Sequence, residues 1–240
     1  RDVHLHRAGR LPFLGAIADR GSAKKKFLFF FAFLGIVMSG ALWLVAQGNW
    51  VLAALFYVAG TIGFSGGNTF YDALLPGVAS EKNVDFTSSL GFALGYIGGG
   101  LLFLVNVLMY LKPAMFGLPD GATAIKLSFL SVAIWWAVFS LPIFLFVEEP
   151  CAECETSIGD AVRAGWQQLM QTLREIRHLK VVGLFLLAYW FYIDGVDTII
   201  RMAVDYGMSL GFPSSALITA LLMVQFIAFP ATLLYLKIAT

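Results

Sequence analysis

The chain has 240 residues, of which 59% are hydrophobic and 13% are charged, and its formal net charge is +1. This composition excludes a soluble globular domain, because one core of this size cannot hide so much apolar surface, and the near-neutral charge excludes a nucleic-acid-binding protein, which needs a strongly basic face. We therefore expect a protein whose solvent is the lipid bilayer.

The apolar residues are grouped in stretches long enough to cross a bilayer as helices. Residues 1–10 are polar, and Leu11 to Ala18 reads as the end of an apolar helix whose beginning is missing. Whole spans then follow in chain order, at Phe27 to Ala46, Val51 to Phe70, Leu90 to Leu111, Leu127 to Val147, Val181 to Ile200 and Ser215 to Leu236. Each should be an α-helix, because a lone segment in lipid can satisfy its backbone hydrogen bonds only in that form. The sequence thus predicts an all-α membrane protein.

Basic residues near the span ends indicate the orientation. The larger set is Arg20, Lys24, Lys25, Lys26, Lys82, Arg163, Arg174, Arg177, Lys180 and Lys237, and the smaller set, on the opposite side, is Lys112, Lys126 and Arg201. Because cytoplasmic loops carry the excess of Lys and Arg, we assign the larger set to the cytoplasm. We expect a multi-pass protein of the bacterial inner membrane, or of the vacuolar membrane if the source is a eukaryote.

The longest predicted loop, Glu148 to Lys180, joins two groups of spans. From Ser157 its apolar residues recur at helical spacing, which predicts an amphipathic helix lying against the membrane. We therefore divide the chain into an N-terminal transmembrane half at 1–147, a cytoplasmic linker at 148–180 and the start of a C-terminal half at 181–240. Cys151 and Cys154 lack the two further ligands that a structural zinc needs, so we interpret them as ordinary loop residues, with a redox or metal role as the alternative, and expect neither a metal nor a cofactor.

The span from Val181 contains Asp194, Asp197 and Arg201, which fall on one helical face. A charge at the middle of a spanning helix costs about 2.5 to 3.5 kcal/mol on insertion scales, so in-span charges usually serve function. We expect the three residues to belong to a substrate or proton pathway, with Asp194 as the deepest carboxylate. The structural alternative is an ion pair between Asp197 and Arg201, spaced i and i+4.

Further spans carry polar residues and small residues. Asn106 and Gln225 lie well inside their spans, where each can line a solute pathway or form an interhelical hydrogen bond. Gly91, Gly95 and Gly99 recur every fourth residue and predict a smooth face for helix packing.

The segment from Gly15 to Gly21, followed by Lys24, Lys25 and Lys26, resembles the loop signature of the major facilitator superfamily. The resemblance implies a cytoplasmic gate, in which Gly15 permits close packing and Asp19, Arg20 and Lys24 pair across helix ends. In this chain the second glycine and the first basic residue are displaced by one position.

Three other stretches resemble the vacuole-effluxer-like branch of that superfamily. They are Phe70 to Pro76, Ser88 to Gly100 and Tyr192 to Ile200. The resemblance implies a helical bundle of twelve spans, of which this fragment covers the end of the second to the eighth, so six whole spans are present. It also implies that Asp72 belongs to the gate and that Pro76 ends its helix.

The best-known members of that branch export amino acids from yeast vacuoles during autophagy. We expect no enzyme but a monomeric secondary active transporter, which moves a small solute, with amino acids suggested by the relatives, by alternating access. Its expected partners are the solute, a coupling proton and membrane lipid.

Other classes remain as alternatives. Gly63-Phe-Ser65-Gly66-Gly67 fits the G-x-S-x-G pattern of a serine hydrolase, as in a rhomboid-like intramembrane protease. Such a serine needs a general base, and the only histidines, His4, His6 and His178, lie outside the spans. We therefore interpret Ser65 and its glycines as helix packing. A non-transporting membrane scaffold is the remaining alternative.

Overall fold

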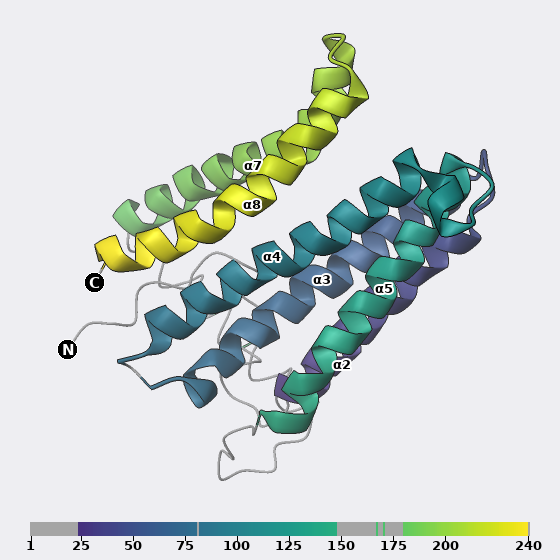
Figure 1. The fold of residues 1–240 in the computed structure, drawn as a ribbon. Coiled ribbons are helices and arrows are strands. Elements are labelled where there is room, and N and C mark those ends of the chain that lie inside the picture. The colour runs from purple at the N-terminus through teal and green to yellow at the C-terminus, as the bar shows by residue number, and fades with distance from the viewer. Residues whose placement is uncertain (1–23, 81, 148–166, 168–169, 171–179, 240) are drawn as a thin grey trace. The chain divides into compact units, whose positions relative to one another are not determined.

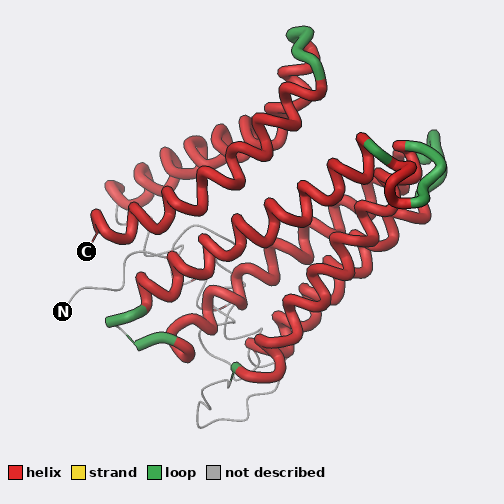
Figure 2. Tube along the Cα trace, in the orientation of Figure 1, coloured by secondary structure: helices red, strands yellow, loops and turns green. Residues whose placement is uncertain are grey.

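A computed structural model describes residues 24–80, 82–147, 167, 170 and 180–239 of the chain. The described part is helical and contains no strand (Figures 1 and 2). Its elements are α2 (Lys24–Ala41), η1 (Leu42–Leu44), α3 (Trp50–Val78), α4 (Val84–Leu111), η2 (Pro113–Phe116), α5 (Gly121–Phe146), α7 (Lys180–Ser209) and α8 (Ser214–Ala239).

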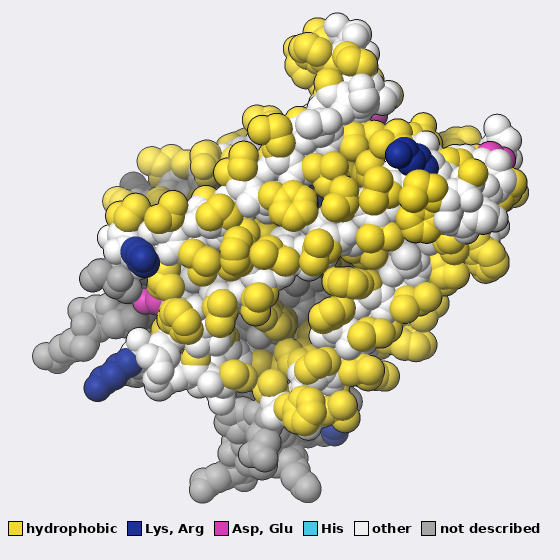
Figure 3. Space-filling model, viewed as in Figure 1, with side chains coloured by type: hydrophobic (Ala, Val, Ile, Leu, Met, Phe, Trp, Pro, Cys, Tyr) yellow, Lys and Arg dark blue, Asp and Glu magenta, His cyan; other side chains and the backbone are white. Residues whose placement is uncertain are grey.

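Six of these helices are long and apolar enough to span a membrane. They coincide with the six spans expected from the sequence, which confirms an all-α, multi-pass membrane protein. Among the described residues no polar or charged side chain is fully buried. Hydrophobic side chains cover most of the face shown in Figure 3, on which few charged side chains are visible.

Several helices run further than the hydropathy of the sequence predicted, among them α5, which begins at Gly121 rather than Leu127, and α7, which ends at Ser209 rather than Ile200. We expected Pro76 to end its helix, but α3 continues to Val78, so this expectation is wrong. Proline lacks a backbone N–H and its ring crowds the carbonyl group four residues earlier, but α3 continues past it. The helix ends where Ala79 donates its N–H to Leu75 O at 3.0 Å. Similarly, α4 begins at Val84 rather than Leu90, because a helix can extend beyond the hydrocarbon into the headgroup region.

The described residues fall into two compact units. One unit contains α7 and the start of α8, and the other contains α2 to α5 and residues 218–239. The expected division of the chain into two halves and a linker stays a prediction. The amphipathic helix expected from Ser157 lies outside the described residues, apart from two helical positions, 167 and 170.

Helices α2, α3 and α5 pack closely because glycines stand at their crossings. A Cβ built on Gly63 of α3 would lie 2.5 Å from the backbone nitrogen of Gly35 in α2, and one built on Gly66 would overlap the Phe31 ring. On the other side, Gly35 contacts the Trp136 ring of α5. These contacts confirm helix packing for the glycines around Ser65.

Aromatic rings complete the contact between α2 and α3. Phe70, which is fully buried, stacks on Phe27 with ring centroids 5.1 Å apart and on Phe31 with centroids 5.9 Å apart. Leu74 is buried one turn further along α3. Together with the glycines, these rings hold α2 and α3 as one antiparallel pair.

Replacing Gly63 by Ala should lower the thermal unfolding midpoint of the protein in detergent. The new methyl group meets backbone atoms of α2 that cannot move aside, and overpacking typically costs about 1–3 kcal/mol, more than the gain of about 1 kcal/mol from replacing a helical glycine. Gly60→Ala in the same helix is the matched control, because its Cβ would meet Met38 Cβ at an ordinary 3.7 Å. Equal midpoints for the two variants would contradict this packing.

Asp120 begins α5 by accepting a hydrogen bond from the backbone N–H of Thr123 at 2.7 Å. This bond, with a second from the Thr123 side chain, holds the pKa of Asp120 below its ordinary value of 3.8. The contribution of the charged cap to stability is therefore complete above pH 3.8 and is lost as the pH falls through the lowered pKa.

We predict that the unfolding midpoint of the wild-type protein decreases more steeply below pH 3.8 than that of Asp120→Asn. The asparagine oxygen still caps the helix but does not titrate. Melting curves of both proteins over a series of acidic buffers test this, and parallel curves would refute the assigned role of the carboxylate.

Candidate functional site

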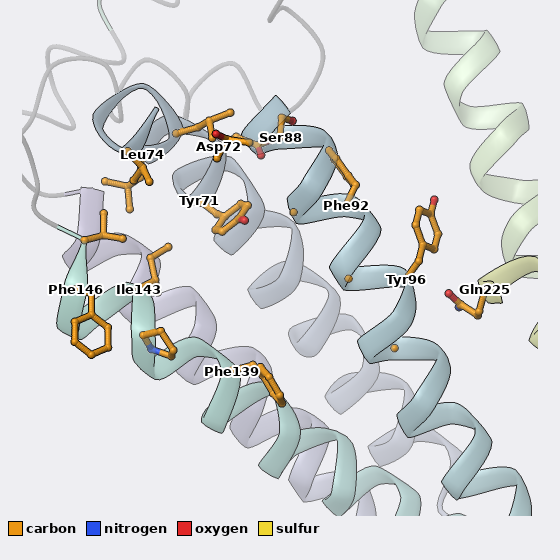
Figure 4. Close-up of a pocket in the computed structure, with 18 residues that line it drawn as sticks. Tyr71, Asp72, Leu74, Ser88, Phe92, Tyr96, Phe139, Ile143, Phe146 and Gln225 are labelled. Atoms are coloured by element: carbon orange, nitrogen blue, oxygen red, sulfur yellow. The ribbon is translucent and has the colours of Figure 1, made fainter. Parts of the chain in front are cut away.

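A cavity of about 690 Å³ lies between the spanning helices of the larger unit (Figure 4). The lining residues come from four helices: Tyr71, Asp72, Leu74, Leu75 and Val78 of α3, Thr87, Ser88, Gly91, Phe92, Gly95, Tyr96 and Gly99 of α4, Phe139, Pro142, Ile143 and Phe146 of α5 with Val147 after it, and Gln225 of α8. The ends of α3 and α5 and the start of α4 all contribute, so the cavity lies toward one end of the bundle.

The walls of this cavity are mainly apolar and aromatic, with a few polar groups. The polar side chains are Tyr71 and Asp72 of α3, Thr87 and Ser88 of α4, Tyr96 of α4 and Gln225 of α8. Small-molecule sites typically combine a predominantly apolar wall with a few polar groups that fix the orientation of a ligand. The cavity therefore has the chemistry of a site for a small amphipathic molecule.

A second cavity, of about 200 Å³, lies between α2, α3 and α5. Asn68 and Ser140 are polar members of its lining. Tyr71, Phe139 and Ile143 line both cavities. These three side chains therefore stand between the two spaces.

Of the expected gate residues, the structure describes Lys24 and Asp72, while Gly15, Asp19 and Arg20 lie outside the described residues. The ammonium of Lys24 donates to Ala73 O at 3.3 Å, next to Asp72 in α3. Lys25 donates to Phe144 O at 3.0 Å and to Val147 O at 2.7 Å. Two adjacent lysines thus bind the ends of two different helices, α3 and α5.

The expected pathway residues do not all lie together. Asp194, Asp197 and Arg201 are exposed on α7, where Asp197 and Arg201 follow Asp194 by three and seven residues. This helix belongs to the smaller unit. Asn106 accepts a hydrogen bond from Ser131 Oγ at 2.9 Å, which links α4 to α5 and is one of the two uses expected for it. Gln225 lines the large cavity.

Gly91, Gly95 and Gly99 also line the large cavity. A Cβ added to Gly95 or Gly99 would meet no described atom within 4 Å, and one added to Gly91 would meet only the Tyr71 hydroxyl, at 3.6 Å. The smooth face expected from the sequence is thus present, but here it faces the cavity. Its role in helix packing stays a prediction.

Sequence reasoning missed most of the cavity wall. Tyr71 and Tyr96 lie inside the stretches Phe70 to Pro76 and Ser88 to Gly100 but were given no role of their own, and Thr87 and Ser88 fell before the predicted start of their span. Ser88 did open one of the stretches that resembled a transporter family. One further feature of the sequence could have indicated the cavity: polar side chains gather at the end of α3 and at the start of α4.

Comparison with known proteins agrees with the resemblance noted in the sequence. The chain is 40% identical over 230 residues to an uncharacterised MFS-type transporter, YxiO, of Bacillus subtilis (strain 168), covering 95% of this chain and 53% of that protein. It is 25% identical over 239 residues to Autophagy-related protein 22 of Pichia angusta, covering 82% of this chain and 43% of that protein. The chain thus spans about half the length of these relatives. No solved structure matches it at a significant level.

The family comparison covers almost the whole sequence. Residues 7–240 match the family model described as "Vacuole effluxer Atg22 like", and this match includes all six spanning helices. The chain therefore belongs to the vacuole effluxer Atg22-like family of membrane proteins.

Proposed function

We propose that the protein containing this chain is a secondary active transporter, which moves a small solute across the membrane by alternating access. The observation that carries this proposal is the partly open cavity of about 690 Å³ lined by spanning helices, which exceeds the space left by ordinary side-chain packing. Its volume falls in the range of about 300–1,000 Å³ that is typical of small-molecule sites.

The relatives support transport rather than scaffolding. One is named as an MFS-type transporter, others as Autophagy-related protein 22, and the matching family is described by the word effluxer. Because the chain spans about half of these relatives, the activity is proposed for the whole protein.

Amino acids are the substrate class that we propose. A zwitterion with an apolar side chain suits a wall of Tyr71, Phe92 and Phe139 beside the polar groups of Ser88 and Gln225. The vacuole effluxer relatives, as noted from the sequence, include amino-acid exporters, so the cavity chemistry and the resemblance agree.

We propose that Asp194 carries a coupling proton. It lies within the spanning segment Val181–Ser209, and a carboxyl group in lipid surroundings can bind or release a proton when its partners rearrange. Asp197 and Arg201 on the same helical face can supply such partners.

The bundle end that carries Lys24 to Lys26 is assigned to the cytoplasm by its positive charge, and Lys24 and Asp72 act there as gate residues.

The proposal is tested by flux into vesicles containing the full-length protein, with radiolabelled amino acids supplied one at a time. A transporter gives saturable flux that depends on an imposed proton gradient. A folded protein that gives no saturable flux with any amino acid would overturn the proposed substrate class.

We predict that Asp194→Asn abolishes gradient-driven accumulation of the solute but leaves exchange of solute across the vesicle membrane. The amide cannot carry a proton, whereas exchange needs no net proton movement. Asp205→Asn is the matched control, because Asp205 is exposed on the same helix but closer to its end. Normal accumulation in Asp194→Asn would remove the proton role from this residue.

A further inference from the structure

The end of α5 has an unusual source of hydrogen bonds. The last carbonyl groups of any helix lack intrahelical partners, and many helices satisfy them with a residue in the left-handed conformation. Val147, which follows α5, instead has an extended backbone with φ −87° and ψ 118°. Among the described residues, two hydrogen bonds to this helix end come from a side chain far away in the sequence.

That side chain is Lys25, in the first turn of α2. Its ammonium group donates to Phe144 O at 3.0 Å and to Val147 O at 2.7 Å, across 119 and 122 residues of sequence. A lysine is poorly placed at the positive N-terminal end of its own helix, but it is well placed at the negative C-terminal end of another. Lys25 therefore acts as a C-terminal cap for α5.

The capped turn is also part of the cavity wall. Phe146 and Val147 line the large cavity, and Ile143 lines it one turn earlier. Because Phe144 O and Val147 O bracket Phe146, the ammonium of Lys25 fixes the backbone that carries this wall. The α3 wall of the cavity is likewise contacted by Lys24, which donates to Ala73 O.

We propose that Lys25 is a positioning residue for transport: by capping α5 it ties the α5 wall of the cavity to the start of α2 and so sets how readily a solute enters from that side. This inference rests on the proposed function. Lys25 does not contact the solute in this proposal but acts through the backbone of residues 144–147.

The neighbouring lysine provides a matched control. Lys26 lies in the same turn of α2 and carries the same charge, but its side chain is exposed whereas that of Lys25 is half-buried. Lys25→Gln and Lys26→Gln therefore remove the same charge from the same helix end. Only the first removes the charged donor from the end of α5, because the glutamine amide is neutral and its side chain is one atom shorter.

The experiment uses a cysteine reporter in the full-length protein. Cys151 and Cys154 are replaced by Ser, Ile143 is replaced by Cys, and the rate of labelling with a membrane-impermeant maleimide is measured. We expect Lys25→Gln to change this rate several-fold, Lys26→Gln to leave it unchanged, and Lys25→Arg to restore it, because a guanidinium also donates to carbonyl groups. Equal rates in Lys25→Gln and Lys26→Gln would overturn the proposal.

A second measurement guards against misfolding and separates the two proposals. If Lys25→Gln does not fold, Lys25→Met is compared with Lys26→Met, because methionine keeps an apolar stem of similar length but donates no hydrogen bond. A labelling change confined to position 25 then supports the inference, while equal rates overturn it. The solute concentration for half-maximal flux should also change more in Lys25→Gln than in Lys26→Gln. If the wild type shows no flux but the variants label as expected, the proposed function alone is rejected. If flux is normal but Lys25→Gln and Lys26→Gln have equal labelling rates and equal half-maximal concentrations, the role of Lys25 alone is rejected.

Discussion

The structure depends on one requirement, that every backbone polar group within the hydrocarbon finds its partner inside the protein. Helices meet this requirement along their length but not at their ends, where the last carbonyl groups remain unpaired. The chain places these ends near charged side chains. Asp120 caps the start of α5, and Lys25, from another helix, binds carbonyl groups at its end. The same requirement that creates the spans therefore also accounts for the contacts that join them.

Close packing and open space are separated within the larger unit. Gly35 and Gly63 bring α2 against α3, and Trp136 of α5 closes the other side of Gly35. The glycine face of α4, in contrast, borders the cavity. The closely packed helices α2, α3 and α5 hold the polar groups of the cavity in place, while the glycine face of α4 leaves room for a ligand. This arrangement suits a binding site.

The spans could be predicted from the sequence because hydropathy and length act locally, and the six predicted spans are the six observed. The end of α3 was misjudged because Pro76 breaks one hydrogen bond without ending the helix. The cavity was not predictable, since Tyr71, Ser88 and Phe139 are distant in sequence and meet only through the packing of three helices. The bond from Lys25 to α5 was hidden for the same reason: it spans 119 residues and leaves no local pattern.

The two lysines at the start of α2 are consecutive, yet they bind different helices. Consecutive helical residues point about 100° apart, so the angular phase of this turn assigns one lysine to α3 and its neighbour to α5. An insertion or deletion of a single residue inside the turn would rotate both ammonium groups away from their acceptors at once. A single-residue insertion or deletion in this turn should therefore break the contacts to both helices, whereas a substitution at one lysine breaks the contact to one helix alone.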